Sequence, residues 1–110
     1  MYRQKGEYVL SKVKFVFLFM GEGYEPQTHY AVMETEFCST TVVGVSDLCT
    51  AQQVAKRLWK EQGIQAIELC GAFMEKGART IIEATEHQVA VGYVIHLPEQ
   101  DALFQKVFGK

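Results

Sequence analysis

Four short apolar runs, rich in β-branched and aromatic residues, alternate along this chain with stretches of helical periodicity. The runs cover residues 13–20, 40–45, 66–70 and 89–96. Within each run, polar and apolar residues show little strict alternation, which is typical of strands covered on both faces of a parallel sheet. The runs therefore predict four strands, and the spacing between them leaves room for a helix in most connections.

The clearest helical pattern lies between the second and third runs. Its apolar positions recur at offsets of three, four and seven, and they are Leu48, Ala51, Val54, Ala55, Leu58 and Trp59. Thr50 and Gln53 have the spacing of a capping box, with Asp47 as a competing cap, and Gly63 stands where a left-handed residue ends many helices. On the outer face of this helix, Lys56, Arg57 and Lys60 are interpreted as a solvated face.

Two further helices are predicted from weaker patterns. One contains Ala78, Ile81, Ile82 and Thr85, with Gly77 marking an irregular start, and the other follows Pro98 and ends near Gly109. The last helix carries the apolar residues Ala102, Leu103, Phe104, Val107 and Phe108. The connection over residues 21–39 is predicted to be a long loop with one short helix at residues 30–33, and it is long enough for a crossover between parallel strands.

This order of elements predicts a single α/β domain over residues 1–110, with residues 1–11 as a candidate flexible N-terminal segment. The expected architecture is a small open, mostly parallel four-stranded sheet with flanking helices and right-handed crossovers. A ferredoxin-like α+β sandwich is the alternative, but it needs a hairpin between its middle strands, where this chain has a well-signalled helix. A four-stranded sheet leaves its edges and part of one face thinly covered. We therefore expect a homodimer, with the C-terminal helix and the aromatic N-terminal segment covering apolar surface across the subunit boundary.

Charge and cysteine content narrow the class of partner. The chain has 11 Lys and Arg against 13 Asp and Glu, a net charge of −2, which disfavours nucleic acid. Its apolar run at residues 13–20 is too short to span a membrane. The three cysteines have no Cys-x-x-Cys or zinc-finger spacing, so the sequence predicts reduced thiols in a cytoplasm and neither a metal nor a cofactor.

Polar residues follow the predicted strands at their carboxyl ends, where open parallel sheets bind ligands. Glu22 follows the first strand, Asp47 follows the second, Gly71 follows the third, and His29 lies in the long first connection. These four residues are the candidate ligand-binding residues. The glycine pattern near Glu22 lacks the spacing of a dinucleotide-binding loop.

Glu68, Cys70 and His96 are the candidate catalytic residues. Glu68 lies between Ile67 and Leu69 in a strand expected to be buried on both faces, where a carboxylate needs a partner. Glu68 and Cys70 share one face of the third strand, and His96 shares a face with Gly92 on the fourth. If these strands are neighbours, a thiol, an imidazole and a carboxylate converge. The alternative is that Cys70 is a core side chain and Glu68 forms a structural ion pair with Arg79.

Three segments carry a resemblance to a known family: Thr41-Val42-Val43-Gly44-Val45, the stretch Ile67-Glu68-Leu69-Cys70-Gly71 with its flanks, and Val89-Ala90-Val91-Gly92-Tyr93-Val94. On these residues the chain resembles a small bacterial family known as a domain of unknown function, over residues 12–96. The resemblance implies a cytoplasmic single-domain α/β protein and supplies no reaction.

The sequence is compatible with three functions. The leading hypothesis is a small-ligand-binding domain with a pocket at the carboxyl ends of the strands. The alternatives are a small enzyme, an isomerase, lyase or hydrolase that uses Cys70 with His96, and a structural or partner-binding module built on the C-terminal helix.

Overall fold

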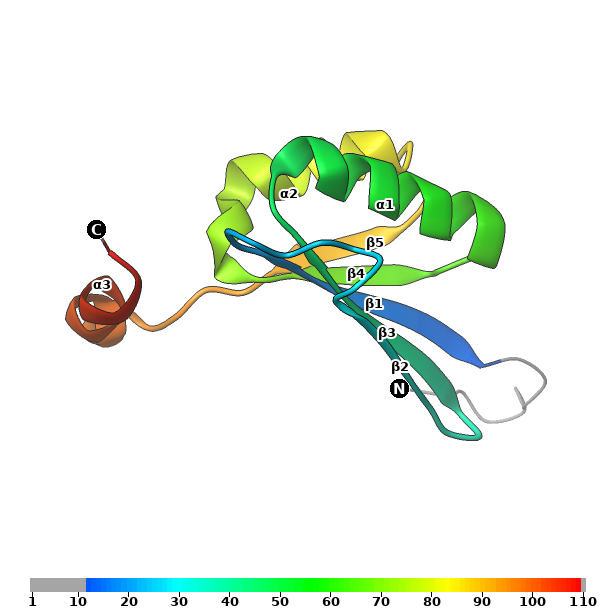
Figure 1. The fold of residues 1–110 in the computed structure, drawn as a ribbon, viewed down its shortest axis with the longest axis horizontal. Helices are drawn as coiled ribbons and strands as arrows, with labels where there is room; N and C mark the ends of the chain where they lie inside the picture. The colour runs from blue at the N-terminus through cyan, green and yellow to red at the C-terminus, as the bar shows by residue number, and fades with distance from the viewer. Residues whose placement is uncertain (1–11, 110) are drawn as a thin grey trace.

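The computed structural model describes residues 12–109 as a five-stranded sheet with helices on one side (Figure 1). The candidate flexible segment, residues 1–11, lies outside the described residues. In chain order the elements are β1 (Val13–Met20), β2 (Tyr30–Glu34), β3 (Cys38–Val45), α1 (Leu48–Gln62), β4 (Ala66–Leu69), a 3-10 turn η1 (Gly71–Phe73), α2 (Met74–Ala84), β5 (Ala90–Tyr93), a second 3-10 turn η2 (Pro98–Gln100) and α3 (Asp101–Phe108).

The strand order is β2-β3-β1-β4-β5. β1 pairs in parallel with both β3 and β4, β4 pairs in parallel with β5, and only the edge strand β2 runs antiparallel to its neighbour. This arrangement confirms the predicted open, mostly parallel α/β sheet and differs from a ferredoxin-like sandwich. The sheet has five strands instead of four.

The additional strand is β2, where the sequence predicted a short helix. Residues 30–34 form a hairpin with β3, in which Tyr30 pairs with Val43 and Val32 pairs with Thr41. The prediction was wrong because a segment this short cannot distinguish helical from strand periodicity, whereas its aromatic and β-branched residues favour the sheet once β3 offers a free edge.

One face of the sheet and the two central helices form the core. α1 and α2 both lie on this face, which we call the helix face (Figure 1). The strand residues at the centre of this face are fully buried, among them Val16 and Leu18 of β1 and Val43 and Val45 of β3, and they pack against Leu58 of α1.

The helix ends follow from local chemistry. The Asp47 carboxylate accepts a hydrogen bond from the Thr50 backbone N–H at 2.7 Å, so Asp47, rather than Thr50, caps α1. Gly63 ends the helix with φ of 68°, as predicted. α2 begins earlier than predicted, at Met74, and Gly77 lies inside it, where an added Cβ would approach the Phe73 side chain to 3.0 Å. Close packing of η1 on α2 thus explains Gly77.

The opposite face of the sheet has no helix over it in the described part of the chain (Figure 1). We call it the open face. Strand alternation places Phe15, Phe17 and Phe19 of β1 on it, beside Val42 of β3. The expectation that the strands are covered on both faces is therefore wrong for this chain, because both covering helices follow crossovers on the same side.

After β5 the chain leaves the sheet. Residues 94–108, which we call the C-terminal arm, include η2 and α3 and extend beyond the body of the domain (Figure 1). α3 has no buried residue. None of the described helices is long and apolar enough to cross a lipid bilayer.

Candidate functional site

The carboxyl ends of β1 and β3 bring three of the predicted ligand-binding residues to one pole of the domain. Glu22 lies exposed in the turn after β1, and His29 immediately precedes β2. The His29 Nδ1 accepts a hydrogen bond from the Glu25 backbone N–H at 2.8 Å, and its ring stands edge-on to Tyr24 at 5.2 Å. His29 thus holds the loop that leads into β2.

Asp47 lies at the same pole, at the start of α1. The hydrogen bond from Thr50 lowers the pKa of the Asp47 carboxyl below its ordinary value, because that bond is made to the charged form. Asp47 is therefore a negatively charged helix cap at neutral pH.

Glu68 lies on the open face and is exposed, so the expectation that it is buried is wrong. Its strand β4 pairs with β5, and Glu68 is the register partner of Gly92. An added Cβ at Gly92 would stand 2.7 Å from the Glu68 Oε1, so the carboxylate lies over the glycine. The alternative of an ion pair with Arg79 is also wrong, because Arg79 binds Glu75 at 2.6 Å on α2.

Cys70 is half-buried at the carboxyl end of β4. Its Sγ accepts a hydrogen bond from the Met20 backbone N–H at 3.3 Å, and its own N–H donates to the Leu18 carbonyl. Gly71 follows it and begins η1, where an added Cβ would stand 3.4 Å from the Val94 carbonyl oxygen. Cys70 therefore ties the end of β4 to the backbone of β1.

His96 lies in the C-terminal arm, because β5 ends at Tyr93, earlier than predicted. The His96 Nε2 is 2.7 Å from the Asp101 Oδ1, and its ring stacks on Phe104 with centroids 4.0 Å apart. Within residues 12–109, no hydrogen bond or ion pair joins His96 to Cys70, and no group of three or more His, Cys, Asp or Glu residues could hold a metal ion. Glu68 lies on the open face, Cys70 at the end of β4 and His96 in the arm, where it pairs with Asp101.

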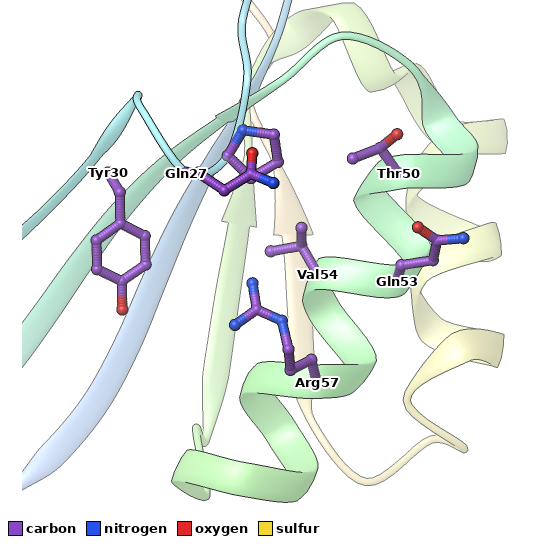
Figure 2. A pocket seen from close by; sticks show the side chains of 7 residues that line it. Gln27, Tyr30, Thr50, Gln53, Val54 and Arg57 are labelled. Carbon is purple, nitrogen blue, oxygen red and sulfur yellow. The ribbon is translucent and has the colours of Figure 1, made fainter.

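A groove that the sequence did not predict opens between α1 and the loop before β2. It is lined by Pro26, Gln27, Tyr30, Thr50, Gln53, Val54 and Arg57 and has a volume of about 440 Å³. The groove exists because α1 and α2 cover the central strands but leave the edge strand β2 uncovered. Tyr30, on the helix face of β2, therefore lies exposed beside α1. Figure 2 shows side chains from the loop, from β2 and from α1 around the same space.

Arg57 supplies the positive charge of this groove. Its guanidinium extends from α1 into the space below Gln27 (Figure 2). In the described part of the chain no carboxylate lies within 4.0 Å of it, whereas Arg79 forms an ion pair with Glu75. Sequence reasoning placed Arg57 on a solvated face with Lys56 and Lys60, and only the position of β2 beside the helix distinguishes it.

A second hollow of about 400 Å³ lies near the amino ends of the strands, lined by Lys12, Lys14, Glu34, Ser39, Thr41, Glu61 and Gln62. Lys12 forms an ion pair with Glu34 at 2.8 Å, which lowers the pKa of that carboxyl, and the Lys14 Nζ donates to the Gln62 carbonyl at 3.0 Å. Because both lysines already have partners here, the groove at Arg57 is the stronger candidate for binding.

The fold and the groove define a small α/β domain with polar side chains gathered at the carboxyl pole of a mostly parallel sheet. The chain belongs to the Family of unknown function (DUF6506), whose model matches residues 13–109. No curated protein and no solved structure matches the chain.

Proposed function

We propose that this protein binds a small acidic molecule, with a carboxylate or phosphate group, in the groove between α1 and β2. The observation that carries the proposal is the Arg57 guanidinium, which faces the groove without an acidic partner among residues 12–109. A guanidinium matches carboxylates and phosphates through paired N–H donors, which makes arginine the common choice for such ligands.

The other lining residues fit the same ligand class. Gln27, Tyr30, Thr50 and Gln53 bring amide and hydroxyl groups to the rim, and Pro26 and Val54 add apolar surface. A few polar groups in a partly apolar concavity are typical of small-molecule sites. The groove begins near the carboxyl ends of β1 and β3, which is the pole where parallel sheets bind ligands, and it continues along α1 to Arg57.

The proposal locates the ligand away from the residues Cys70 and His96. An enzyme that uses those two has less support, because the thiol and the imidazole each contact other groups. The cellular setting we propose is a bacterial cytoplasm, given the sequence resemblance and the free cysteines Cys38, Cys49 and Cys70. The net charge of −2 argues against nucleic acid or an anionic membrane as the partner.

The test is a thermal-shift screen of small mono- and dicarboxylates and phosphate esters, followed by calorimetric titration of the best compound. We expect Arg57→Gln to weaken its binding at least about tenfold, since a charge-assisted hydrogen bond is lost. Lys60→Gln is the matched control, because Lys60 is a cation on the same helix whose Nζ lies 4.2 Å from the Trp59 ring centroid and does not line the groove. Equal losses in both variants would show nonspecific charge attraction and overturn the proposal, as would a screen without any stabilising acid.

A further inference from the structure

The open face presents an apolar row across the middle of the sheet. The register aligns Val42 of β3, Phe17 of β1, Glu68 of β4 and Gly92 of β5 in one line. Phe17 and Phe19 stack with ring centroids 4.9 Å apart, and Phe19 is 38% exposed. Parallel sheets are normally covered on both faces, and contiguous exposed apolar surface marks a site of interaction.

The C-terminal arm presents a second apolar surface. Its exposed large apolar residues are Val94, Ile95, Leu97, Leu103, Phe104, Val107 and Phe108. On α3, Leu103 with Val107 and Phe104 with Phe108 are four residues apart, so they form one stripe. An isolated helix of eight residues is marginal in water, and it needs this stripe to pack against something.

The backbone directs the arm away from the open face of its own chain. Val94 donates to the Leu69 carbonyl and continues the direction of β5. Pro98 restricts Leu97 to an extended conformation, with ψ of 143°, and His96 holds α3 through Asp101 and Phe104. The arm therefore extends past the carboxyl ends of the strands (Figure 1).

Charge complementarity links the two surfaces. Glu68 is the carboxylate in the apolar row, and Lys106 lies at the edge of the α3 stripe, one turn from Leu103. Among residues 12–109, neither Glu68 nor Lys106 has an oppositely charged partner within 4.0 Å. A helix that covers the row would bury the carboxylate, and a cation at its edge would then compensate for the lost hydration.

We propose that the C-terminal arm docks across the open face of a second copy of this chain, with Lys106 of one copy paired with Glu68 of the other. Each chain has one arm and one open face, so a reciprocal exchange around a two-fold axis satisfies both surfaces in two copies. The interface specifies the homodimer that the sequence predicts, and it is independent of ligand binding at Arg57.

The first experiment measures mass by light scattering and the dimer dissociation constant by sedimentation. Wild-type protein should have twice the chain mass, and the double variant Val107→Glu/Phe108→Glu should raise the dissociation constant at least about 100-fold, since apolar anchors dominate such interfaces. Val32→Glu is the matched control, because Val32 is 46% exposed but lies on the helix face of β2. Its effect should stay within about twofold.

Mixing variants distinguishes exchange from an arm that folds back on its own sheet. Phe17→Glu disrupts the open face, and the double variant Val107→Glu/Phe108→Glu disrupts the arm. In a mixture of the two, the intact arm of the Phe17→Glu chain can still dock on the intact open face of the double variant. We expect a heterodimer to form in the mixture although each variant alone is monomeric. If Phe17→Glu fails to fold by circular dichroism, Phe15→Glu on the same face replaces it in the mixture.

The charged pair gives a second readout. Glu68→Lys and Lys106→Glu should each weaken the dimer, and the chain that carries both substitutions should recover most of the lost affinity. A monomeric wild type, a dimer insensitive to the arm variant, or a mixture without heterodimer would each overturn the proposal.

Discussion

Asp47 shows how one carboxylate fixes the local geometry beside the groove. It caps α1 through Thr50, and Thr50 in turn lines the groove. The sequence named Asp47 as a ligand-binding candidate because it follows a strand. In the structure, Asp47 caps the helix that carries both Thr50 and Arg57. The position of Arg57 therefore depends on this cap.

The cap predicts an acid dependence of stability. Because the folded pKa of Asp47 is lowered below its ordinary value of about 3.9, its stabilising effect is complete above that value and is lost as the pH falls through the folded pKa. We expect Asp47→Asn to match the wild-type melting temperature at pH 7, because asparagine is an equally good cap. Between pH 5 and pH 2 the variant should lose less stability than wild type.

Melting curves over this range test the prediction, and Asp47→Ala, which removes the cap, should melt lower than both proteins at pH 7. The Glu34 carboxyl, whose pKa is also lowered, is common to all three chains, so the difference between them isolates Asp47. Parallel acid profiles for wild type and Asp47→Asn would contradict the assignment.

At the scale of elements, α1 begins at the Asp47 cap and ends at Gly63, and both residues are candidate helix boundaries in the sequence. Gly63 adopts a φ of 68°, which a residue with a Cβ adopts only with strain, and its N–H closes the helix on the Trp59 carbonyl at 3.1 Å. The position and length of α1 follow from these two ends, and so does the reach of Arg57 along the groove.

Gly63→Ala should therefore lower the free energy of unfolding by about 1 kcal/mol. Gly71→Ala is the matched control, because its backbone has no positive φ and an added Cβ would make only an ordinary contact with the Val94 carbonyl at 3.4 Å. Urea denaturation of the two variants measures the difference. A larger loss from Gly71→Ala would show that the end of β4 is more tightly constrained than the end of α1.

The edge strand β2 is the element that the sequence did not predict, and the groove depends on it. Tyr30 faces the groove only because it pairs with Val43 in an antiparallel hairpin. The pattern of residues 30–34 is too short to be decisive, and its pairing partner lies outside the segment itself. Long-range pairing of this kind is visible in the folded chain and not in local periodicity.

At the scale of the whole molecule, the domain is asymmetric about its sheet. The helix face has a complete core that includes Val16, Leu18 and Ile67, whereas the aromatic residues of β1 on the open face are partly exposed. The free energy of unfolding of one chain therefore resides on the helix face. In the dimer that we propose, the open face and the arm would contribute through their burial against the second copy.

Hydrogen exchange should show this division. Amides of β1 should be the most protected, because that strand is central and pairs on both sides. Amides of α3 should exchange slowly in wild-type protein and at least about tenfold faster in the variant Val107→Glu/Phe108→Glu, since an eight-residue helix without packing frays. Protection of α3 that is unchanged in a monomeric variant would show that the arm is stable by itself.

Local patterns in the sequence determined the strands β1, β3, β4 and β5, the helices and the end of α1 at Gly63, because periodicity and capping depend on residues a few positions apart. They left Thr50 and Asp47 as alternative caps of α1, and the structure decided for Asp47. They also indicated that Gly92 leaves space for a neighbour, which is the Glu68 carboxylate. Only the tertiary structure decided that His96 pairs with Asp101 in the arm, that Glu68 is exposed and that Arg57 faces a groove beside β2. These outcomes depend on strand order, on which face the crossovers cover and on where β5 ends, and each of them is set by contacts between residues far apart in the chain.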